Sequence, residues 1–370
     1  NHLGVEVPRR NRWWWDVLKH GQGSDYAHFF DIDWAEDNGA GGKIALPVLG
    51  APGDTDALKL EHLDDEDVLT YYDHVFPLAP GSYAGLDDDP AAVHERQHYR
   101  LMYWCDGIIT YRRFFSINGL AGVRQEDEDV FNATHSCLRE LVGEGLIDGV
   151  RVDHPDGLAD PFGYLTRLRE LIGPDTWLIV EKILAADEPL DPHLDIHGTT
   201  GYDALREFDG VFVDANAAGT LGELAREYSG STWDADAVEA AEWELKARIA
   251  NEELAPEVRR LARAVRRDSQ TFSDVTDAEL TEVLVALVSR MPVYRADYRC
   301  LSRVTPTLIA QLAELGHNPA ALDLTAAALA ASGEAAHRFA QVCGAVMAKG
   351  VEDTLFYRAC RLVALQEVGG

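Results

Sequence analysis

The sequence predicts an α/β fold that contains parallel β-α-β units. From about residue 129, stretches with apolar residues at helical spacing alternate with short, apolar, β-branched stretches. Helix and strand in strict succession are typical of a parallel sheet. From about residue 216 to 345 the sequence becomes rich in Ala, Glu and Arg and is amphipathic. This second stretch predicts a largely helical insertion or subdomain.

The elements follow in chain order. Residues 1–125 are rich in aromatic side chains and in Gly and Pro, which predicts long loops. Helical spacing predicts one helix over 129–144. Beyond it, "IDGVRVD" (147–153) predicts a buried strand, "PFGYLTRLRELIG" (161–173) a helix that ends at its final glycine, and "TWLIVEKIL" (176–184) another buried strand.

In the last third, "PVYRADY" (292–298) predicts one more strand, and helices return from 305 to 347. The segment "GTTGYD" (198–203) has two open interpretations. It is a Gly-punctuated loop over a site, or it is the start of a helix with Thr199 or Thr200 as the capping residue.

Composition narrows the class of protein. Of the 370 residues, 46% are hydrophobic and 26% charged, and 33 basic against 63 acidic residues give a net charge of −30. This acidity disfavours nucleic acid and anionic membranes as partners, and no apolar run approaches the length of a membrane helix. The five cysteines are widely spaced and form no CxxC pair, so we expect a reducing, cytoplasmic location.

Two of the predicted strands end in a carboxylate. Asp153 follows "GVRV" and Glu181 follows "WLIV", 28 residues later. The carboxyl ends of parallel strands are where active sites are built, and a facing pair of carboxylates is the basis of glycoside chemistry. Arg151 lies on the same strand face as Asp153 and keeps it ionised, whereas the apolar residues before Glu181 are expected to raise the pKa of that group. The alternative is purely structural: Arg151 forms a buried ion pair with Asp153, and Glu181 pairs with Lys182.

At these residues the sequence resembles the α-amylase superfamily of glycoside hydrolases. "GVRVDHPDGL" is similar to the β4 motif that supplies the catalytic Asp, and "IVEKIL" to the β5 motif that supplies the acid/base Glu. "NHLG" at the start is similar to the end of the β3 motif, whose His contacts the sugar. Further strings resemble the trehalose-forming members of the superfamily and occur along the whole chain: "WWWDVLKHG", "YAHFFDIDW", "LAGVRQED", "GTTGYD" and "AKGVEDTLFYR".

The resemblance implies a (β/α)₈ TIM barrel of α-amylase type. By this alignment the barrel is incomplete, because its first strands and its last strand are missing, and the chain is a fragment of a longer protein. Residues 1–215 are expected to run from the end of strand 3 through strand 5, with long aromatic loops. Residues 216–345 form the helical insertion, and residues 346–370 form strand 7 and the following helix.

The resemblance also implies roles for individual residues. Asp153 is the nucleophile, Glu181 the acid/base, and Asp353 in "KGVEDT" the third acid, although an N-cap role for Asp353 stays open. Typical amylases have His where this chain has Glu352. The residues expected to bind the substrate are His2, Trp14, Tyr26, Phe29, Arg151, His154, Asp156, Lys182 and Glu352.

The implied activity is an isomerisation that needs no cofactor. The reducing-end α-1,4 linkage of a maltooligosaccharide becomes an α,α-1,1 linkage by a retaining double displacement, and a trehalose-releasing hydrolase is the functional partner. Two alternatives stay open: an α-1,4-glucan hydrolase or glucanotransferase, and a non-catalytic glucan-binding protein. A divalent-metal site of Asp153, His154 and Asp156 with His2 or His135 is disfavoured, because Pro155 stiffens the string and no HxxxH or HxH pair lies nearby.

Overall fold

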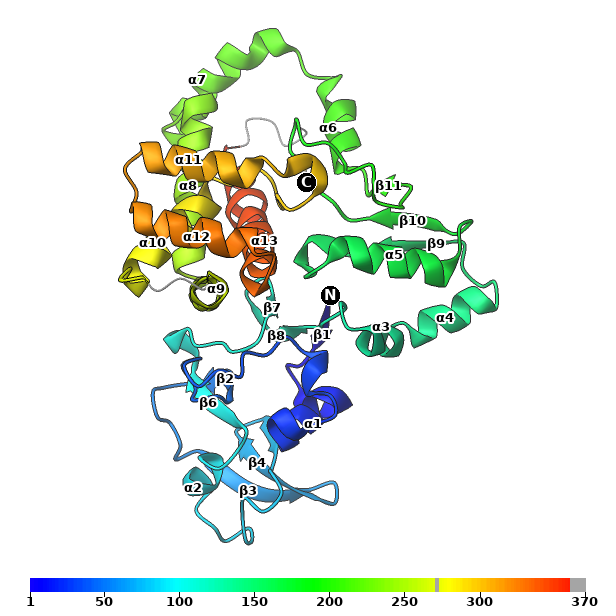
Figure 1. The fold of residues 1–370 in the computed structure, drawn as a ribbon, viewed down its shortest axis with the longest axis vertical. Coiled ribbons are helices and arrows are strands. Elements are labelled where there is room, and N and C mark those ends of the chain that lie inside the picture. Colours follow the sequence, from blue (N-terminus) through cyan, green and yellow to red (C-terminus); the bar gives the residue numbers. More distant parts are fainter. Residues whose placement is uncertain (270–272, 360–370) are drawn as a thin grey trace. The chain divides into compact units, whose positions relative to one another are not determined.

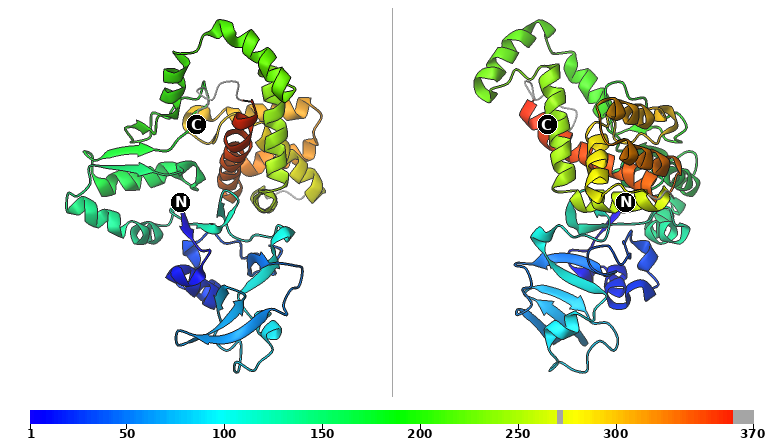
Figure 2. Two further views of the ribbon diagram at one scale, coloured as in Figure 1. Left: turned by 180° about the vertical axis from the view of Figure 1, so that it is seen from behind. Right: turned by 60° about the vertical axis from the view of Figure 1, so that its left-hand side comes forward.

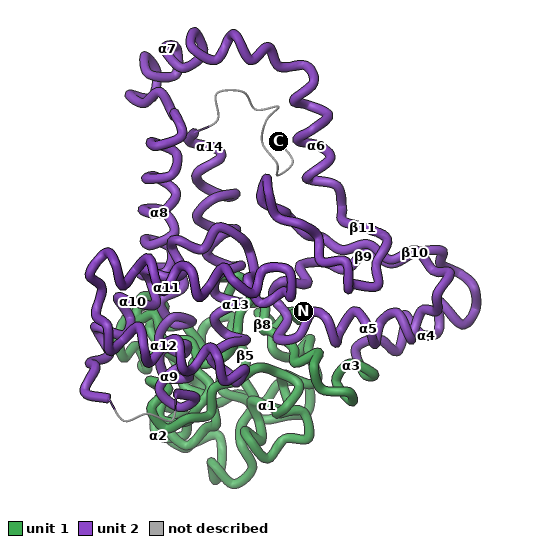
Figure 3. The backbone as a smooth tube through the Cα atoms, turned by 45° about the horizontal axis from the view of Figure 1, so that its top comes forward, with its two compact units in different colours: residues 1–133 green, residues 134–370 purple. Residues whose placement is uncertain are grey.

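The computed structural model describes residues 1–269 and 273–359, and the chain forms two compact units, Asn1–Ala133 and Thr134–Gly370 (Figure 3). Each unit has its own sheets and its own buried core. The boundary between these units, after Ala133, is not one of the domain boundaries expected from the resemblance. The expected domains of the barrel remain predictions. Among the described residues, no helix has the length and apolar character needed to cross a membrane.

The first unit contains more strand than its loop-rich sequence suggests (Figures 1 and 2). β1 (His2–Gly4), β8 (Ile117–Gly122) and β7 (Arg113–Phe114) form an antiparallel sheet in that order. β2 (Ile44–Leu49) pairs in parallel with β6 (Tyr99–Tyr103). β3 (Leu58–Leu63), β4 (Glu66–Tyr71) and β5 (His74–Pro77) form an antiparallel meander.

Helix α1 (Arg12–His20) anchors the core of this unit. Asn11 caps it by accepting hydrogen bonds from the backbone N–H groups of Trp13 and Trp14, so the helix begins where the sequence offers a good cap. Its apolar stripe then buries Trp14, Val17 and Leu18 in the hydrophobic core of the unit. Two further helices lie in or begin in this unit: α2 (Pro90–His94) and α3 (Glu128–Thr134).

The second unit carries the predicted parallel β-α-β unit. β9 (Gly149–Val152), β10 (Trp177–Val180) and β11 (Gly198–Thr199) are parallel neighbours in chain order, and α5 (Pro161–Ile172) connects β9 to β10. The two strands and the helix expected at 147–184 are therefore confirmed, with slightly shorter strands. Leu178 and Val180 of β10 are buried, which explains the apolar run.

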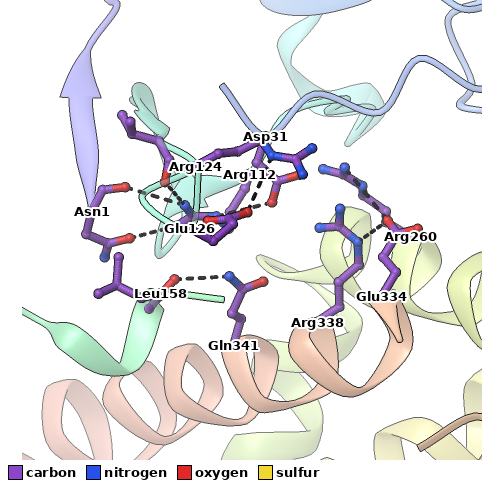
Figure 4. A network of polar contacts seen from close by, with 12 residues as sticks. Asn1, Asp31, Arg112, Arg124, Glu126, Leu158, Arg260, Glu334, Arg338 and Gln341 are labelled. Atoms are coloured by element: carbon purple, nitrogen blue, oxygen red, sulfur yellow. Dashed lines mark hydrogen bonds and ion pairs between the residues drawn. The ribbon is translucent and has the colours of Figure 1, made fainter. Parts of the chain in front are cut away.

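The rest of the second unit is mostly helical (Figure 1). The helices are α4 (Ser136–Gly143), α6 (Tyr202–Gly210), α7 (Ala218–Ser229), α8 (Ala235–Asn251), α9 (Ala255–Asp268), α10 (Asp277–Ser289), α11 (Val304–Glu314), α12 (Pro319–Ala330), α13 (Glu334–Met347) and α14 (Phe356–Ala359). Helices α8, α9, α10, α12 and α13 pack on one another. Glu334 at the start of α13 pairs with Arg338 of the same helix and lies 4.0 Å from Arg260 of α9 (Figure 4).

Three local predictions were wrong. The helix expected over 129–144 is interrupted at His135, whose backbone dihedral angles are not helical. Residues 128–143 therefore form two separate helices, α3 and α4. Residues 292–298 form no strand; instead the fully buried Arg295 donates to the carbonyl groups of Asp156, Leu158 and Ala159. In place of the strand expected at the start of 346–370, α13 continues directly into a π-helix, Ala348–Leu355.

The described residues form a mixed α/β structure with one parallel three-stranded sheet of neighbouring strands. Such an order is compatible with a segment of a barrel and also with an open sheet. The fold class α/β is therefore confirmed, and the barrel itself remains a prediction.

Candidate active site

The two expected carboxylates lie side by side at one end of the parallel sheet. In the register of β9 and β10, Val152 is paired with Val180, so Asp153 and Glu181 are the next residues on adjacent strands. The ladder continues one step further, because the N–H of Glu181 donates to the carbonyl of Val152 at 2.8 Å. Strand pairing alone therefore brings the two acids together.

Arg151 joins the two carboxylates. Its Nη1 lies 3.1 Å from Oδ1 of Asp153, and its Nη2 lies 3.0 Å from Oε1 of Glu181. A guanidinium presents its N–H groups in a fixed fork, which makes it a rigid clamp for two anions. The Asp153 side chain is 53% exposed and that of Glu181 is 25% exposed, so both acids are accessible and Glu181 is the more enclosed one. The structural alternative is contradicted on two points: the Arg151–Asp153 ion pair is exposed and not buried, and Glu181 pairs with Arg151 and not with Lys182.

The surroundings of Glu181 act on its proton affinity in a definite direction. Burial and the negative charge of Asp153 raise the pKa of Glu181 above its ordinary value, while the His154 N–H and Arg151 work against this rise. The backbone N–H of His154 donates to Oε2 of Glu181 at 3.1 Å. To do so, His154 adopts a left-handed conformation with φ of 43°, which turns the chain sharply after Asp153. His154 thus contacts the acid through its backbone.

Tyr202 is a site residue that the sequence analysis did not single out. It begins α6, and its hydroxyl lies 3.4 Å from Oε1 of Glu181. Neither of the two Thr residues caps this helix, because Gly201 is the N-cap residue and makes no side-chain bond. Thr199 instead bonds to Asp203 and to the N–H of Gly201, and the turn it stabilises leads into Tyr202. The feature of the sequence that could have indicated Tyr202 is its place in "GTTGYD", directly after a third parallel strand.

Asp156 and Lys182 do not face the same space as Asp153 and Glu181. Nζ of Lys182 lies 3.0 Å from Oδ2 of Asp156, and the two side chains are only 3% and 4% exposed. Lys182 also lies 3.2 Å from Glu188, and the Tyr298 hydroxyl donates to Asp156. The expectation that these two residues bind sugar is therefore corrected: their polar atoms are used in a buried ion-pair cluster.

Glu352 and Asp353 lie within the π-helix Ala348–Leu355. Glu352 is buried, and its charge adds to the effect of burial in raising the pKa of Tyr294 and of Tyr202. Asp353 is exposed and pairs with Lys349 at 2.6 Å. Because Asp353 lies inside this helix, it is not the N-cap of α14. No hydrogen bond or ion pair within the described part of the chain joins Asp353 to Asp153 or Glu181.

The remaining candidates belong to the first unit. The ring of His2 contacts that of Phe114 at a tilt of 31°, with the ring centroids 4.0 Å apart. Tyr26 is half-buried and meets Phe29 edge to face, and Phe29 itself is buried. Trp14 has no exposed surface and contacts Phe30 and Tyr111 edge to face. Trp14 and Phe29 are therefore core residues in this structure, and a stacking role on sugar is not open to Trp14.

The metal alternative has no geometric support in the described residues, where no three His, Cys, Asp or Glu side chains gather in a way that could hold an ion. His135 has a structural role, because its Nε2 is hydrogen-bonded to the hydroxyl of Tyr164 at 2.9 Å.

The sequence is similar to proteins that are already known. No protein-family model matches the sequence. The curated proteins named "Putative maltooligosyl trehalose synthase" from two Mycobacterium tuberculosis strains, CDC 1551 / Oshkosh and H37Rv, are each 47% identical over 371 residues, which is 100% of this chain and 46% of theirs. The chain thus spans about half the length of the curated relatives it matches.

Solved structures give the same result. The maltooligosyltrehalose synthase of Arthrobacter ramosus superposes with a TM-score of 0.85 at 42% identity, over 98% of this chain and 46% of that one. The structure of a hypothetical maltooligosyl trehalose synthase from Sulfolobus tokodaii gives 0.77 at 30% identity, over 98% and 45%. These neighbours have an α-amylase-type fold, and this is the class of protein that the chain resembles. Within that class the chain resembles the maltooligosyl trehalose synthases over its whole length, as its motifs predicted.

Proposed function

We propose that the chain carries the catalytic carboxylates of an intramolecular transglycosylase, a (1→4)-α-D-glucan 1-α-D-glucosylmutase. The substrate is a maltooligosaccharide, and the product carries an α,α-1,1 linkage at its former reducing end. The observation that carries the proposal is the pair Asp153 and Glu181 at the ends of adjacent parallel strands, bridged by Arg151 at 3.1 and 3.0 Å. The similarity of the whole chain to proteins named for this activity supports it.

The bridged pair favours a double displacement that retains configuration. Retaining carboxylates stand about 5–5.5 Å apart, whereas inverting ones stand farther apart and leave room for a water molecule between the general base and the substrate. Arg151 contacts both carboxylates and so holds them close together, as the retaining mechanism requires. Arg151 also offsets the repulsion between the two acids, while burial and the charge of Asp153 raise the pKa of Glu181 and so favour the protonated form that a proton donor requires.

In the first step an Asp153 oxygen attacks the anomeric carbon of the penultimate glucose residue. The bond to the glycosidic oxygen breaks, and Glu181 donates its proton to that oxygen, which releases the terminal glucose. In the second step the anomeric hydroxyl of this glucose attacks the glycosyl-enzyme ester. Glu181 takes up the hydroxyl proton, Asp153 leaves as a carboxylate, and the 1,1 linkage forms. The reaction exchanges one glycosidic bond for another and needs no cofactor.

The remaining parts of the proposal concern the frame around this pair. We propose that the parallel strands belong to an incomplete (β/α)₈ barrel and that Asp353 is the third acid, which grips sugar hydroxyls. His2, Tyr26, His154 and Glu352 are retained as proposed substrate contacts, with Tyr202 added on geometric grounds. A trehalose-releasing hydrolase is the proposed functional partner, and the cytoplasm the proposed location.

Incubation of the chain with maltopentaose tests the proposal. Isomerisation removes reducing ends without shortening the sugar, and mass spectrometry combined with a reducing-end assay measures both quantities. Shorter sugars would instead identify the hydrolase or glucanotransferase alternative. Binding of maltopentaose without any change in it would identify the glucan-binding alternative. Either of these last two results would overturn the proposed transglycosylase activity.

A further inference from the structure

Directly behind the carboxylate pair lies a sealed cluster of opposite charges that the proposed reaction does not use. It consists of Lys182, Asp156 and Glu188, with Tyr294 and Tyr298 beside them. Nζ of Lys182 lies 3.0 Å from Asp156 and 3.2 Å from Glu188, and all three side chains are at most 4% exposed. The lysine lies over both tyrosine rings, 5.6 and 5.3 Å from their centroids.

The place of this cluster in the chain is informative. Lys182 is the residue after Glu181, and Asp156 is three residues after Asp153. Consecutive side chains in an extended segment point to opposite sides. Glu181 accordingly points towards Arg151, and Lys182 points into the cluster. The two segments that carry the proposed nucleophile and acid are thus tied to one another a second time, below the site.

Other contacts hold the Asp156 segment in place from the same side. Arg295 has no exposed surface and donates to the carbonyl of Asp156 at 2.8 Å, and Gln341 of α13 donates to the carbonyl of Gly157 at 3.1 Å. The hydroxyl of Tyr298 donates to Oδ1 of Asp156 at 3.0 Å. The segment around Asp156 is therefore fixed, and the Lys182–Asp156 ion pair connects it to the backbone next to Glu181.

We infer that Lys182 is a positioning residue, whose buried ion pairs with Asp156 and Glu188 fix the separation of the Asp153 and Glu181 carboxylates. The kinetic consequence rests on the proposed function; the structural consequence does not. If the tie is cut, the strand ends are free to separate, and the charge of Asp153 acts less strongly on Glu181. The enclosure of Glu181 also decreases.

The direct test is the pKa of Glu181 in the folded chain, measured by ¹³C NMR titration of carboxyl-labelled glutamate, with Glu181→Gln used to assign the resonance. In Lys182→Met we expect this pKa to fall towards the ordinary glutamate value of about 4.3, because Asp153 moves away from Glu181 and Glu181 becomes more exposed. Lys246→Met is the matched control. Lys246 is an equally buried lysine, paired with Glu242 on α8, and its removal should lower stability and leave the pKa of Glu181 unchanged.

Removing one partner of a buried ion pair is costly, so a second variant covers the case in which Lys182→Met does not fold. The triple variant Asp156→Asn, Lys182→Met, Glu188→Gln replaces the whole cluster with uncharged side chains of similar volume, which is often tolerated. We expect the triple variant to fold and to show the same lowered pKa of Glu181. A pKa equal to that of the wild type, in whichever variant folds, would overturn the inference.

The kinetic arm uses maltopentaose. We expect kcat of Lys182→Met to fall about 100-fold, the scale of a small misplacement of reacting groups, with KM unchanged within about twofold because Lys182 does not contact the sugar. A raised KM with an unchanged kcat would instead make Lys182 a substrate contact and refute the positioning role. If the wild-type chain leaves maltopentaose unchanged, the proposed function fails, while the NMR titration still decides the role of Lys182.

Discussion

Two ion-pair clusters lie back to back at the end of β10, and they differ in almost every physical respect. On one side Arg151 joins Asp153 and Glu181, with side chains that are 53% and 25% exposed. On the other side Lys182 joins Asp156 and Glu188, and none of the three is more than 4% exposed. Glu181 of the first cluster and Lys182 of the second are consecutive residues. Their side chains point to opposite sides because the segment is extended, and this places the two clusters on opposite sides.

The difference shows how this fold divides two tasks. Ion pairs that water can reach contribute little to stability, yet their groups stay available to a ligand and to protons. Charges sealed from water are costly to bury and strongly destabilising to leave unpaired, so they specify one arrangement of the chain. The open cluster is suited to chemistry, and the sealed cluster is suited to hold the open one in place.

The largest effect is expected from the open cluster. Asp153→Asn removes the proposed nucleophile without changing size, and kcat on maltopentaose should fall about 10⁴-fold or more. Thermal unfolding should change little, since the Asp153 side chain is half exposed. Asp160→Asn, which alters an exposed helix cap, is the control and should keep its activity. A turnover near that of the wild type would remove Asp153 from the mechanism.

Trp14 tests the contrast between sealed and open positions in the first unit. Its indole ring has no exposed surface and packs on Phe30 and Tyr111. Trp14→Phe should therefore lower the free energy of unfolding by about 1–3 kcal/mol, and Trp14→Ala by about 3–5 kcal/mol. Denaturant unfolding of the chain measures this loss. A raised KM without loss of stability would instead make Trp14 a wall of the sugar site.

Arg151 tests the electrostatics of the open cluster. Its charge lowers the pKa of Glu181, so removing the charge in Arg151→Met raises that pKa further. Because the proposed acid must be protonated at the start of the reaction, the alkaline limb of kcat/KM should move to higher pH, by about one unit. Arg151→Lys keeps a charge there and should move the limb less. A shift to lower pH would contradict the assignment of Glu181 as the acid.

The smallest effect is expected from Glu334, which is neither sealed nor part of a site. Arg338 and Arg267 lower its pKa to about 2. Figure 4 shows the contact between Glu334 and Arg338. An unfolded glutamate titrates near pH 4.3, so this pairing stabilises the fold above that pH, and the contribution is lost as the pH falls from about 4.3 to about 2. Glu334 is over a third exposed, so its pairing is worth less than about 1 kcal/mol.

The check is chemical denaturation of wild type and Glu334→Gln at several pH values. The small difference in unfolding free energy at pH 7 should disappear near pH 2. A difference that persists in acid would assign the effect to packing of α13 on α9 and not to charge.

The sequence alone determined the parallel β-α-β unit and the pairing of Asp153 with Glu181. The apolar runs of β9 and β10 and the helical spacing of α5 are local patterns, and each acid follows its strand directly. Once two strands are parallel neighbours, their carboxyl ends lie together, so this part of the site needs no knowledge of distant contacts.

The tertiary structure alone decided which polar residues face the site and which are sealed. Asp156 and Lys182 lie in the same short motifs as the acids, yet their partners include Glu188 and Tyr298, and the latter is 142 residues from Asp156. Tyr202 reaches Glu181 only because α6 follows a third parallel strand. Trp14 is a core residue because its helix packs into a core formed by strands far along the chain. Periodicity reports the environment along an element, whereas the partner of a buried polar group is set by long-range packing, which no local pattern encodes.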